Sequence, residues 1–215
     1  MCIRDRAYTR ELNALIEHCC TPGNGGVTAS DFPLSRLNQS QLESLPLAFD
    51  AVEDIYTLSP MQQGMLFHTL YEQTAGDYIN QIRVTAQGLD VARFQHAWDA
   101  TVQAHDVLRS GFFWEGRLEW PCQVVYREAR LPIQVLDWRA MPERELELRN
   151  LQQAQRRQGF DLAKAPLVRL VLVRTDEQCY ELIYTSHHIL MDGWSNSRLF
   201  GDCLLYTSDA ADERS

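Results

Sequence analysis

Two apolar stretches decide the fold class: LVRLVLVR at residues 167–174 and CYELIYT at residues 179–185. Their Leu, Val and Ile content predicts two central strands of a sheet. The second stretch runs without a break into SHHILMDGW at residues 186–194, and we expect a helix over residues 194–200. Two histidines at a strand end, followed by Asp192 and Gly193 in a turn, therefore form the candidate site of an α/β (α+β) fold.

The residues before these strands show helix and strand patterns in turn. In SPMQQGMLFHTLYE, Ser59, Pro60 and Gln62 match the start of a helix with a capping box. Asp90 is the expected N-cap of an amphipathic helix over residues 91–105. Further helices are expected at residues 9–20, 39–45 (with Asn38 as N-cap) and 142–158, and further strands at residues 78–86, 107–114, 122–127 and 132–136.

Composition excludes several classes of protein. The chain of 215 residues is 45% hydrophobic and 23% charged, which is ordinary for a soluble globular protein. A net charge of −9 argues against nucleic acid as a partner. No apolar run is long enough to span a bilayer and no signal core follows the N-terminus, so we expect a cytoplasmic protein without a membrane partner. No C-x-x-C pair is present, which argues against a zinc ribbon or a thioredoxin site.

The two ends of the chain match translated sequencing adapter. Codons for MCIRDR (residues 1–6) are the reverse complement of a transposase mosaic-end adapter, and the other strand of that adapter encodes the CLLYTSDAAD that begins at Cys203. We therefore expect residues 1–6 and 203–215 to be adapter-derived. A natural polar tail is the alternative.

The histidine pair is compatible with acid–base chemistry. A neutral imidazole titrates near pH ~6.5 and can accept or position a proton. Side chains alternate along a strand, so His187 and His188 should point to opposite faces. No third ligand stands at zinc spacing, Ser186 is not in a G-x-S-x-G turn, and no phosphate-binding or dinucleotide-binding glycine motif is present. A purely structural histidine pair remains the alternative from residue types alone.

Three stretches together resemble one family. HHILMDG is similar to the HHxxxDG signature of nonribosomal peptide synthetase condensation domains. LSPMQQGMLFH (Leu58 to His68) resembles the family's first core motif. AHDVLRSGF resembles its second, R-H-E-x-L-R-x-x-F, with Ala104 and Asp106 replacing Arg and Glu. Chloramphenicol acetyltransferase and plant acyltransferases carry motifs related to HHxxxDG alone.

The resemblance implies a chloramphenicol-acetyltransferase-like condensation-domain fold, of which this chain would hold the N-terminal lobe only. The likeness spans residues 54–202. Residues 7–36 are similar to the tail of an upstream epimerization or condensation-type domain, and residues 37–53 would be the linker between the two.

The resemblance also implies a reaction and roles for named residues. The acceptor's α-amine would attack the donor's thioester and form a peptide bond. His188 would position that amine or take its proton, and the backbone N–H of Gly193 could face the developing oxyanion. Asp192 would hold the loop by pairing with Arg109, while His187 would pack structurally. The domain would bind no cofactor of its own, because both substrates ride on phosphopantetheine arms of carrier domains.

The expected partners are carrier domains of the same synthetase and its adenylation and epimerization domains. The upstream similarity also favours a donor of D configuration. The main alternative is a stand-alone acyltransferase that acts on CoA or carrier thioesters, since the spacing of His187 and Asp192 also fits glycerolipid acyltransferases. A docking module with degenerate chemistry is a third possibility. We expect this fragment alone to be inactive.

Overall fold

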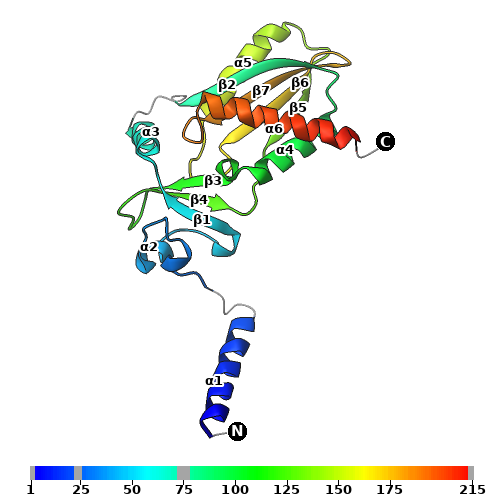
Figure 1. Ribbon diagram of the computed structural model, residues 1–215. Helices are drawn as coiled ribbons and strands as arrows, with labels where there is room; N and C mark the ends of the chain where they lie inside the picture. The colour runs from blue at the N-terminus through cyan, green and yellow to red at the C-terminus, as the bar shows by residue number, and fades with distance from the viewer. Residues whose placement is uncertain (1–2, 22–25, 72–77, 213–215) are drawn as a thin grey trace.

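The computed structural model describes residues 3–21, 26–71 and 78–212, which form two β-sheets flanked by helices (Figure 1). The larger sheet has the strand order β2-β7-β6-β5, with bounds Ile79–Gln87, Cys179–His187, Val168–Arg174 and Ile133–Asp137. β7 pairs antiparallel with both β2 and β6, whereas β5 lies parallel to β6. The two apolar stretches are therefore the central strands, as their composition predicts.

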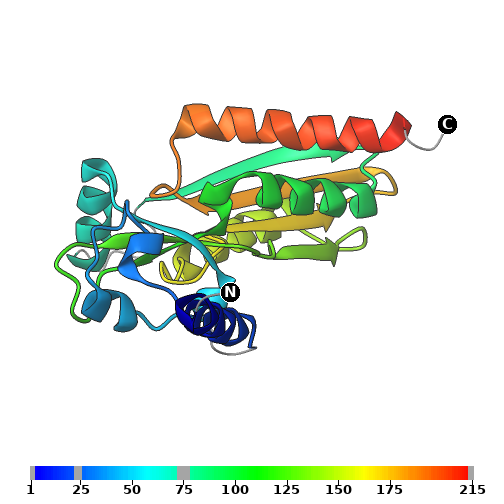
Figure 2. The ribbon, with the colours of Figure 1, turned by 60° about the horizontal axis from the view of Figure 1, so that its bottom comes forward.

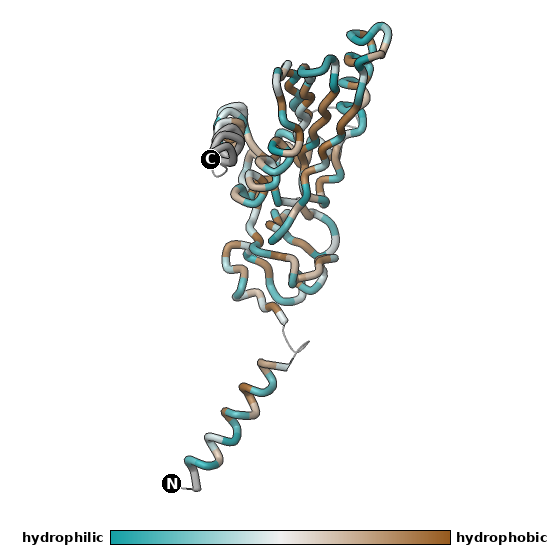
Figure 3. The backbone as a smooth tube through the Cα atoms, turned by 90° about the vertical axis from the view of Figure 1, so that its right-hand side faces the viewer, coloured by the Kyte–Doolittle hydropathy of each residue, from teal (hydrophilic) through white to brown (hydrophobic). Residues whose placement is uncertain are grey.

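Helices cover both faces of the larger sheet. On β6, Leu170 and Leu172 pack into the main core together with side chains of α4 (Val91–Ala104) and α6 (Gly193–Asp212). The alternate residues Val171 and Val173 pack instead with Leu148 of α5 (Arg144–Gln158). This alternation explains why the strand is apolar at nearly every position (Figure 3). Figure 2 shows α6 running along the face that α4 also covers.

The smaller sheet has the order β1-β4-β3, with bounds Val52–Thr57, Cys122–Tyr126 and Ser110–Phe113. The expected linker, residues 37–53, packs against this sheet. Leu42 of α2 (Gln39–Glu43) is fully buried in a cluster with Val52, Ile55 and Val124. Asn38 caps α2 as expected, and its Oδ1 accepts from Gln41 N. Its apolar side chains therefore share a core with the smaller sheet.

Several expected elements differ from those observed. The strand expected over residues 107–114 begins with a short 3₁₀ helix, Asp106–Arg109, and only Ser110–Phe113 is extended. The helix expected from Pro142 begins at Arg144, because Glu143 adopts a left-handed conformation with φ 49°. The helix after the histidine motif continues to Asp212 instead of ending at residue 200.

The two terminal helices differ in how they relate to the sheets. α1 (Ile3–Cys20) stands away from the body, and its side chains from residue 5 onward are exposed (Figures 1 and 3). At the other end, Cys203 is 3% exposed in the main core. The adapter origin of residues 1–6 and 203–215 stays a prediction. Within the described ranges, no helix is both long and apolar enough to cross a membrane.

Candidate active site at the end of β7

The histidine pair sits where β7 ends, beside the start of β2. Ile79 lies opposite His187 in the antiparallel register, and Asn80 lies opposite Ser186. The backbone N–H of His188 donates to the carbonyl of Tyr78 at 2.7 Å. Tyr78 has φ 60°, a left-handed conformation that is uncommon for a residue with a side chain. The motif is therefore fixed by backbone contacts to a neighbouring strand.

The two imidazoles occupy different environments: His187 is the last residue of β7, and His188 is the first residue of the turn that follows. His187 is 2% exposed, and its Nδ1 accepts a hydrogen bond from Ile189 N at 3.1 Å. Its Nε2 is buried and has no partner among the described residues. Burial, and secondarily the neighbouring His188, lowers the pKa of His187 to about 4. The ring is thus held neutral at physiological pH, which suits a packed residue better than an acid or base.

His188 is half-buried and is held through one ring nitrogen. Its Nδ1 lies 3.0 Å from Asn80 Nδ2 and 3.0 Å from the carbonyl oxygen of Met191. Its Nε2 makes no hydrogen bond to any residue that the structure describes. With Nδ1 engaged, Nε2 is the nitrogen available to a substrate.

Asp192 is the N-cap of α6, and its predicted ion pair with Arg109 is wrong. Its Oδ1 accepts from the backbone N–H of Ser195 at 2.8 Å, and this hydrogen bond is the main reason why the pKa of Asp192 is lowered. The role of holding the loop is therefore met by the helix that the loop enters. A carboxylate at this position also faces the positive end of the helix dipole.

Arg109 is buried at 3% exposure and binds elsewhere. Its Nη1 donates to Glu53 and to the carbonyl of Tyr126, and its Nη2 donates to Asp106. These contacts join the 3₁₀ helix to β1 and β4 of the smaller sheet. Sequence spacing gave no signal for the contact with Glu53, which lies 56 residues away in the chain.

Gly193 opens α6 on an exposed surface. A Cβ at this position would meet nothing within 4 Å, so the described residues alone do not require glycine here. Its backbone N–H is at the helix start, where the first N–H groups have no intrahelical acceptor. It makes no hydrogen bond to another described residue. The geometry thus leaves this donor free for an anionic or carbonyl oxygen.

A residue that we expected only to cap a helix also reaches the histidine loop. Gln62 completes the predicted capping box, since its Oε1 accepts from Ser59 N at 3.0 Å. Its Nε2 donates to Ile189 O at 3.3 Å and to Gln123 Oε1 at 3.0 Å. The first core motif, in α3 (Pro60–Tyr71), is thereby connected to the HHxxxDG loop and to β4.

A scan of family models matches residues 52–210 to the family described as "Condensation domain". The chain belongs to the condensation-domain family. The match begins at β1 and covers both sheets and the histidine motif. The family membership expected from three motifs is confirmed.

Curated relatives are large peptide synthetases. One of the linear gramicidin synthase proteins of Brevibacillus parabrevis is 42% identical over 197 residues, covering 91% of this chain and 4% of that protein. Tyrocidine synthase 2 of the same species is 40% identical over 158 residues, covering 72% of this chain and 4% of that protein. This condensation-domain segment thus spans a small part of the relatives that it matches.

Solved structures agree on the fold. The starter condensation domain of rhizomide synthetase RzmA superposes with a TM-score of 0.66 at 21% identity, over 76% of this chain and 41% of that one. The EpoB cyclization-docking bidomain from Sorangium cellulosum gives 0.64 at 26% identity, over 78% and 33%. The mixed α/β condensation-domain fold is confirmed, and this chain covers part of it.

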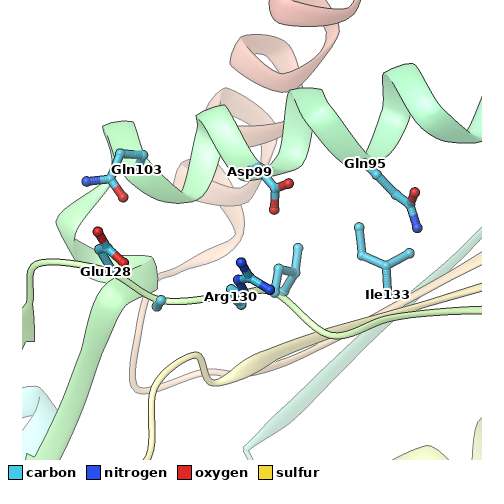
Figure 4. Close-up of a pocket in the computed structure, with 8 residues that line it drawn as sticks. Gln95, Asp99, Gln103, Glu128, Arg130 and Ile133 are labelled. Carbon is cyan, nitrogen blue, oxygen red and sulfur yellow. The ribbon is translucent and has the colours of Figure 1, made fainter.

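One pocket of this condensation-domain segment lies away from the histidine motif. A hollow of about 510 Å³ lies between α4 and the segment that leads into β5. Gln95 and Asp99 line it from the helix and Arg130 from the opposite side (Figure 4). No residue of the HHxxxDG motif lines it. A second hollow, of about 440 Å³, is lined by Leu190 and Met191 of the motif.

Proposed function

We propose that this chain is part of a condensation domain that forms a peptide bond between two carrier-bound substrates. The donor is a thioester on the phosphopantetheine arm of one carrier domain, and the acceptor presents its α-amine from another. The amine nitrogen attacks the thioester carbonyl, the C–S bond breaks, and the proton lost by nitrogen ends on the pantetheine thiol. The domain contributes no cofactor of its own to this exchange.

His188 is the residue that meets the amine. The half-buried ring with Nδ1 engaged and Nε2 free is the single observation that carries the proposal. Nε2 accepts a hydrogen bond or a proton from the attacking nitrogen, and so orients its lone pair toward the thioester carbon. The backbone N–H of Gly193 donates to the oxyanion that develops on the thioester's carbonyl oxygen as the amine adds.

The test is a substitution in the parent synthetase. With loaded carrier domains, His188→Ala should slow formation of the dipeptidyl carrier at least about 100-fold, the usual contribution of a positioned acid or base. Intact-protein mass spectrometry of the carrier measures the product. His188→Ala with near-normal turnover would remove the assignment. The control is Gln81→Leu, because the Gln81 side chain donates its hydrogen bonds to Gln152 O and Thr185 and not to His188. This variant should keep turnover within about 2-fold.

The donor is of D configuration at its reacting residue. Support comes from residues 7–36, which are similar to the tail of an epimerization domain that would deliver a mixture of epimers. The condensation site would then have to choose between them, and one clashing side chain is worth about 1–3 kcal/mol. Competition between D- and L-configured donor thioesters on the parent, with chiral analysis of the product, decides the matter. Preference for the L donor would contradict both the stereochemistry and our interpretation of the upstream segment.

The partners are the carrier, adenylation and epimerization domains of the same cytoplasmic synthetase. The condensation segment, residues 54–202, would be the N-terminal lobe, and half of the substrate cleft would come from the missing lobe. Without it, donor and acceptor cannot be held in attack geometry. The 215-residue chain should therefore give no detectable product with loaded carriers, and turnover by this chain would show that one lobe suffices.

A further inference from the structure

His188 Nδ1 has two polar neighbours: one requires it to donate a hydrogen bond, and the other, as placed, requires it to accept one. Met191 offers a backbone carbonyl oxygen at 3.0 Å, which can only accept a hydrogen bond. Asn80 offers its side-chain amide, also at 3.0 Å, with Nδ2 as the nearer atom. Nδ1 carries either a proton or a lone pair, so it cannot donate to the carbonyl and accept from the amide at once.

Only one of these two neighbours can change between donating and accepting a hydrogen bond. The Met191 carbonyl belongs to the loop that Asp192 and Gln62 hold, and a carbonyl has no donor form. The Asn80 amide, turned by half a revolution, presents Oδ1 in place of Nδ2. The turn breaks no other contact, because the Asn80 side chain has no further hydrogen-bond partner in the part of the chain that is described.

We propose that Asn80 is a positioning residue for His188: its Oδ1, together with Met191 O, holds the proton on Nδ1 and leaves the lone pair on Nε2. Two acceptors on one N–H also fix the plane of the ring. Asn80 is well placed for this task, because the backbone around it is paired with the end of β7 and the turn that follows. Tyr78 O accepts from His188 N, and Asn80 itself lies opposite Ser186 in the strand register.

The inference rests on the proposed function, since it supplies the tautomer that the reaction needs. An amine can be oriented or deprotonated only by a nitrogen with a free lone pair. If Nε2 takes the proton, both acceptors at Nδ1 remain satisfied by the same N–H. Asn80 is not itself expected to touch the substrates.

Two substitutions separate the accepting role from a merely structural one. Asn80→Asp keeps an acceptor and cannot donate, so it should preserve the arrangement. Asn80→Leu fills a similar volume and has neither a hydrogen-bond donor nor an acceptor. Gln81→Leu is the matched control on the same strand, because Gln81 bonds Thr185 and Gln152 O and does not touch His188.

The tautomer is measured by ¹⁵N NMR of the imidazole nitrogens in the 215-residue chain at about pH 8.5, above the ordinary titration range of histidine. His188→Gln assigns the resonance by its loss. We expect Nδ1–H in the wild type, in Asn80→Asp and in Gln81→Leu, and a shift toward Nε2–H in Asn80→Leu. A wild type with Nε2–H, or an unchanged tautomer in Asn80→Leu, overturns the proposal.

Turnover of the parent synthetase gives the second readout. Asn80→Leu should lower kcat about 10-fold with little change in KM for the acceptor, Asn80→Asp should recover most of it, and Gln81→Leu should stay near wild type. Equal loss in the Asp and Leu variants contradicts an accepting role. A normal tautomer series combined with an active His188→Ala would leave the Asn80 assignment intact and refute the proposed function instead.

Discussion

His187 and His188 are neighbours in sequence, yet burial separates their chemistry. His187 is enclosed, and the charged form of a buried imidazole loses its hydration without gaining a partner. His188 is half-buried and keeps Nε2 clear of the described residues. The same residue type thus serves packing at one position and is available for catalysis at the next.

The burial of His187 makes stability depend on pH. Its pKa is about 4 in the folded chain and near 6.5 when unfolded, so the unfolded state binds the proton first as pH falls. The contribution of the neutral ring is complete above pH 6.5 and is lost between pH 6.5 and 4, by up to about 3 kcal/mol. His187→Asn keeps an acceptor for Ile189 N and removes the titration.

Urea unfolding at several pH values measures this effect. The difference in free energy of unfolding between wild type and His187→Asn should change across that window in the direction that disfavours the wild type at low pH. A constant difference from pH 7 to pH 4.5 would show that His187 has the same pKa in the folded and the unfolded chain.

Asp192 acts at the start of α6 and not through Arg109. Asp192→Ala removes the N-cap and should lower the midpoint of thermal unfolding by about 2–4 °C, whereas Asp192→Asn, which can still cap, should stay close to wild type. Thermal melts followed by circular dichroism compare the two. If Asn destabilises as much as Ala, the negative charge matters more than the cap.

At the scale of elements, Gln62 connects α3, β4 and the histidine loop with one side chain. Gln62→Glu keeps the oxygen that accepts from Ser59 N but turns a second oxygen toward Ile189 O and Gln123 Oε1. We expect a loss of about 1–3 kcal/mol at pH 7. The loss should shrink as the pH falls toward ~4.3, because protonation of the new carboxyl restores a donor.

The control for this substitution is the next residue of the same helix. Among the described residues, the side chain of Gln63 donates only to Leu58 O, just before α3, so Gln63→Glu should cost less. Equal costs for the two variants, measured by urea unfolding, would mean that the contact with the histidine loop adds nothing to stability.

β3 and the segment before β6 approach each other too closely for a side chain at residue 111. A Cβ on Gly111 would lie 2.7 Å from the backbone oxygen of Ala163. Gly111→Ala should therefore destabilise the fold by about 1–3 kcal/mol. Gly64→Ala in α3, where a Cβ meets nothing within 4 Å, should be neutral or stabilising by about 1 kcal/mol. Similar midpoints of urea unfolding in the two variants would contradict the close approach.

At the scale of the whole molecule, we expect the segment before β1 to unfold together with the sheets. Leu42 is fully buried against the smaller sheet, and Leu34, eight residues earlier, is 63% exposed. Leu42→Ala should cost about 2–5 kcal/mol, and Leu34→Ala within about 0.5 kcal/mol. Equal urea midpoints for the two variants would indicate that this segment unfolds independently of the sheets.

The sequence by itself determined the elements and the motif. Apolar composition marked the strands β6 and β7, and apolar periodicity marked the helix α4. Local side-chain chemistry marked the caps at Asn38, Ser59 and Asp90. These features depend on residues within a few positions of one another, so a single chain carries the full signal. The expectation that His187 and His188 point to opposite faces stays a prediction from strand alternation, because His188 lies in the turn after β7.

Only the tertiary structure decided which distant residues meet. Asn80 reaches His188 across 108 positions, Gln62 reaches Ile189 across 127, and Arg109 binds Glu53 where we had expected Asp192. No local pattern specifies such pairs, because they arise from the strand order and from how α3 and the smaller sheet pack beside the histidine loop. The sequence gives the donor and acceptor groups of each polar side chain. Which hydrogen-bond partner it meets depends on burial and on strand register.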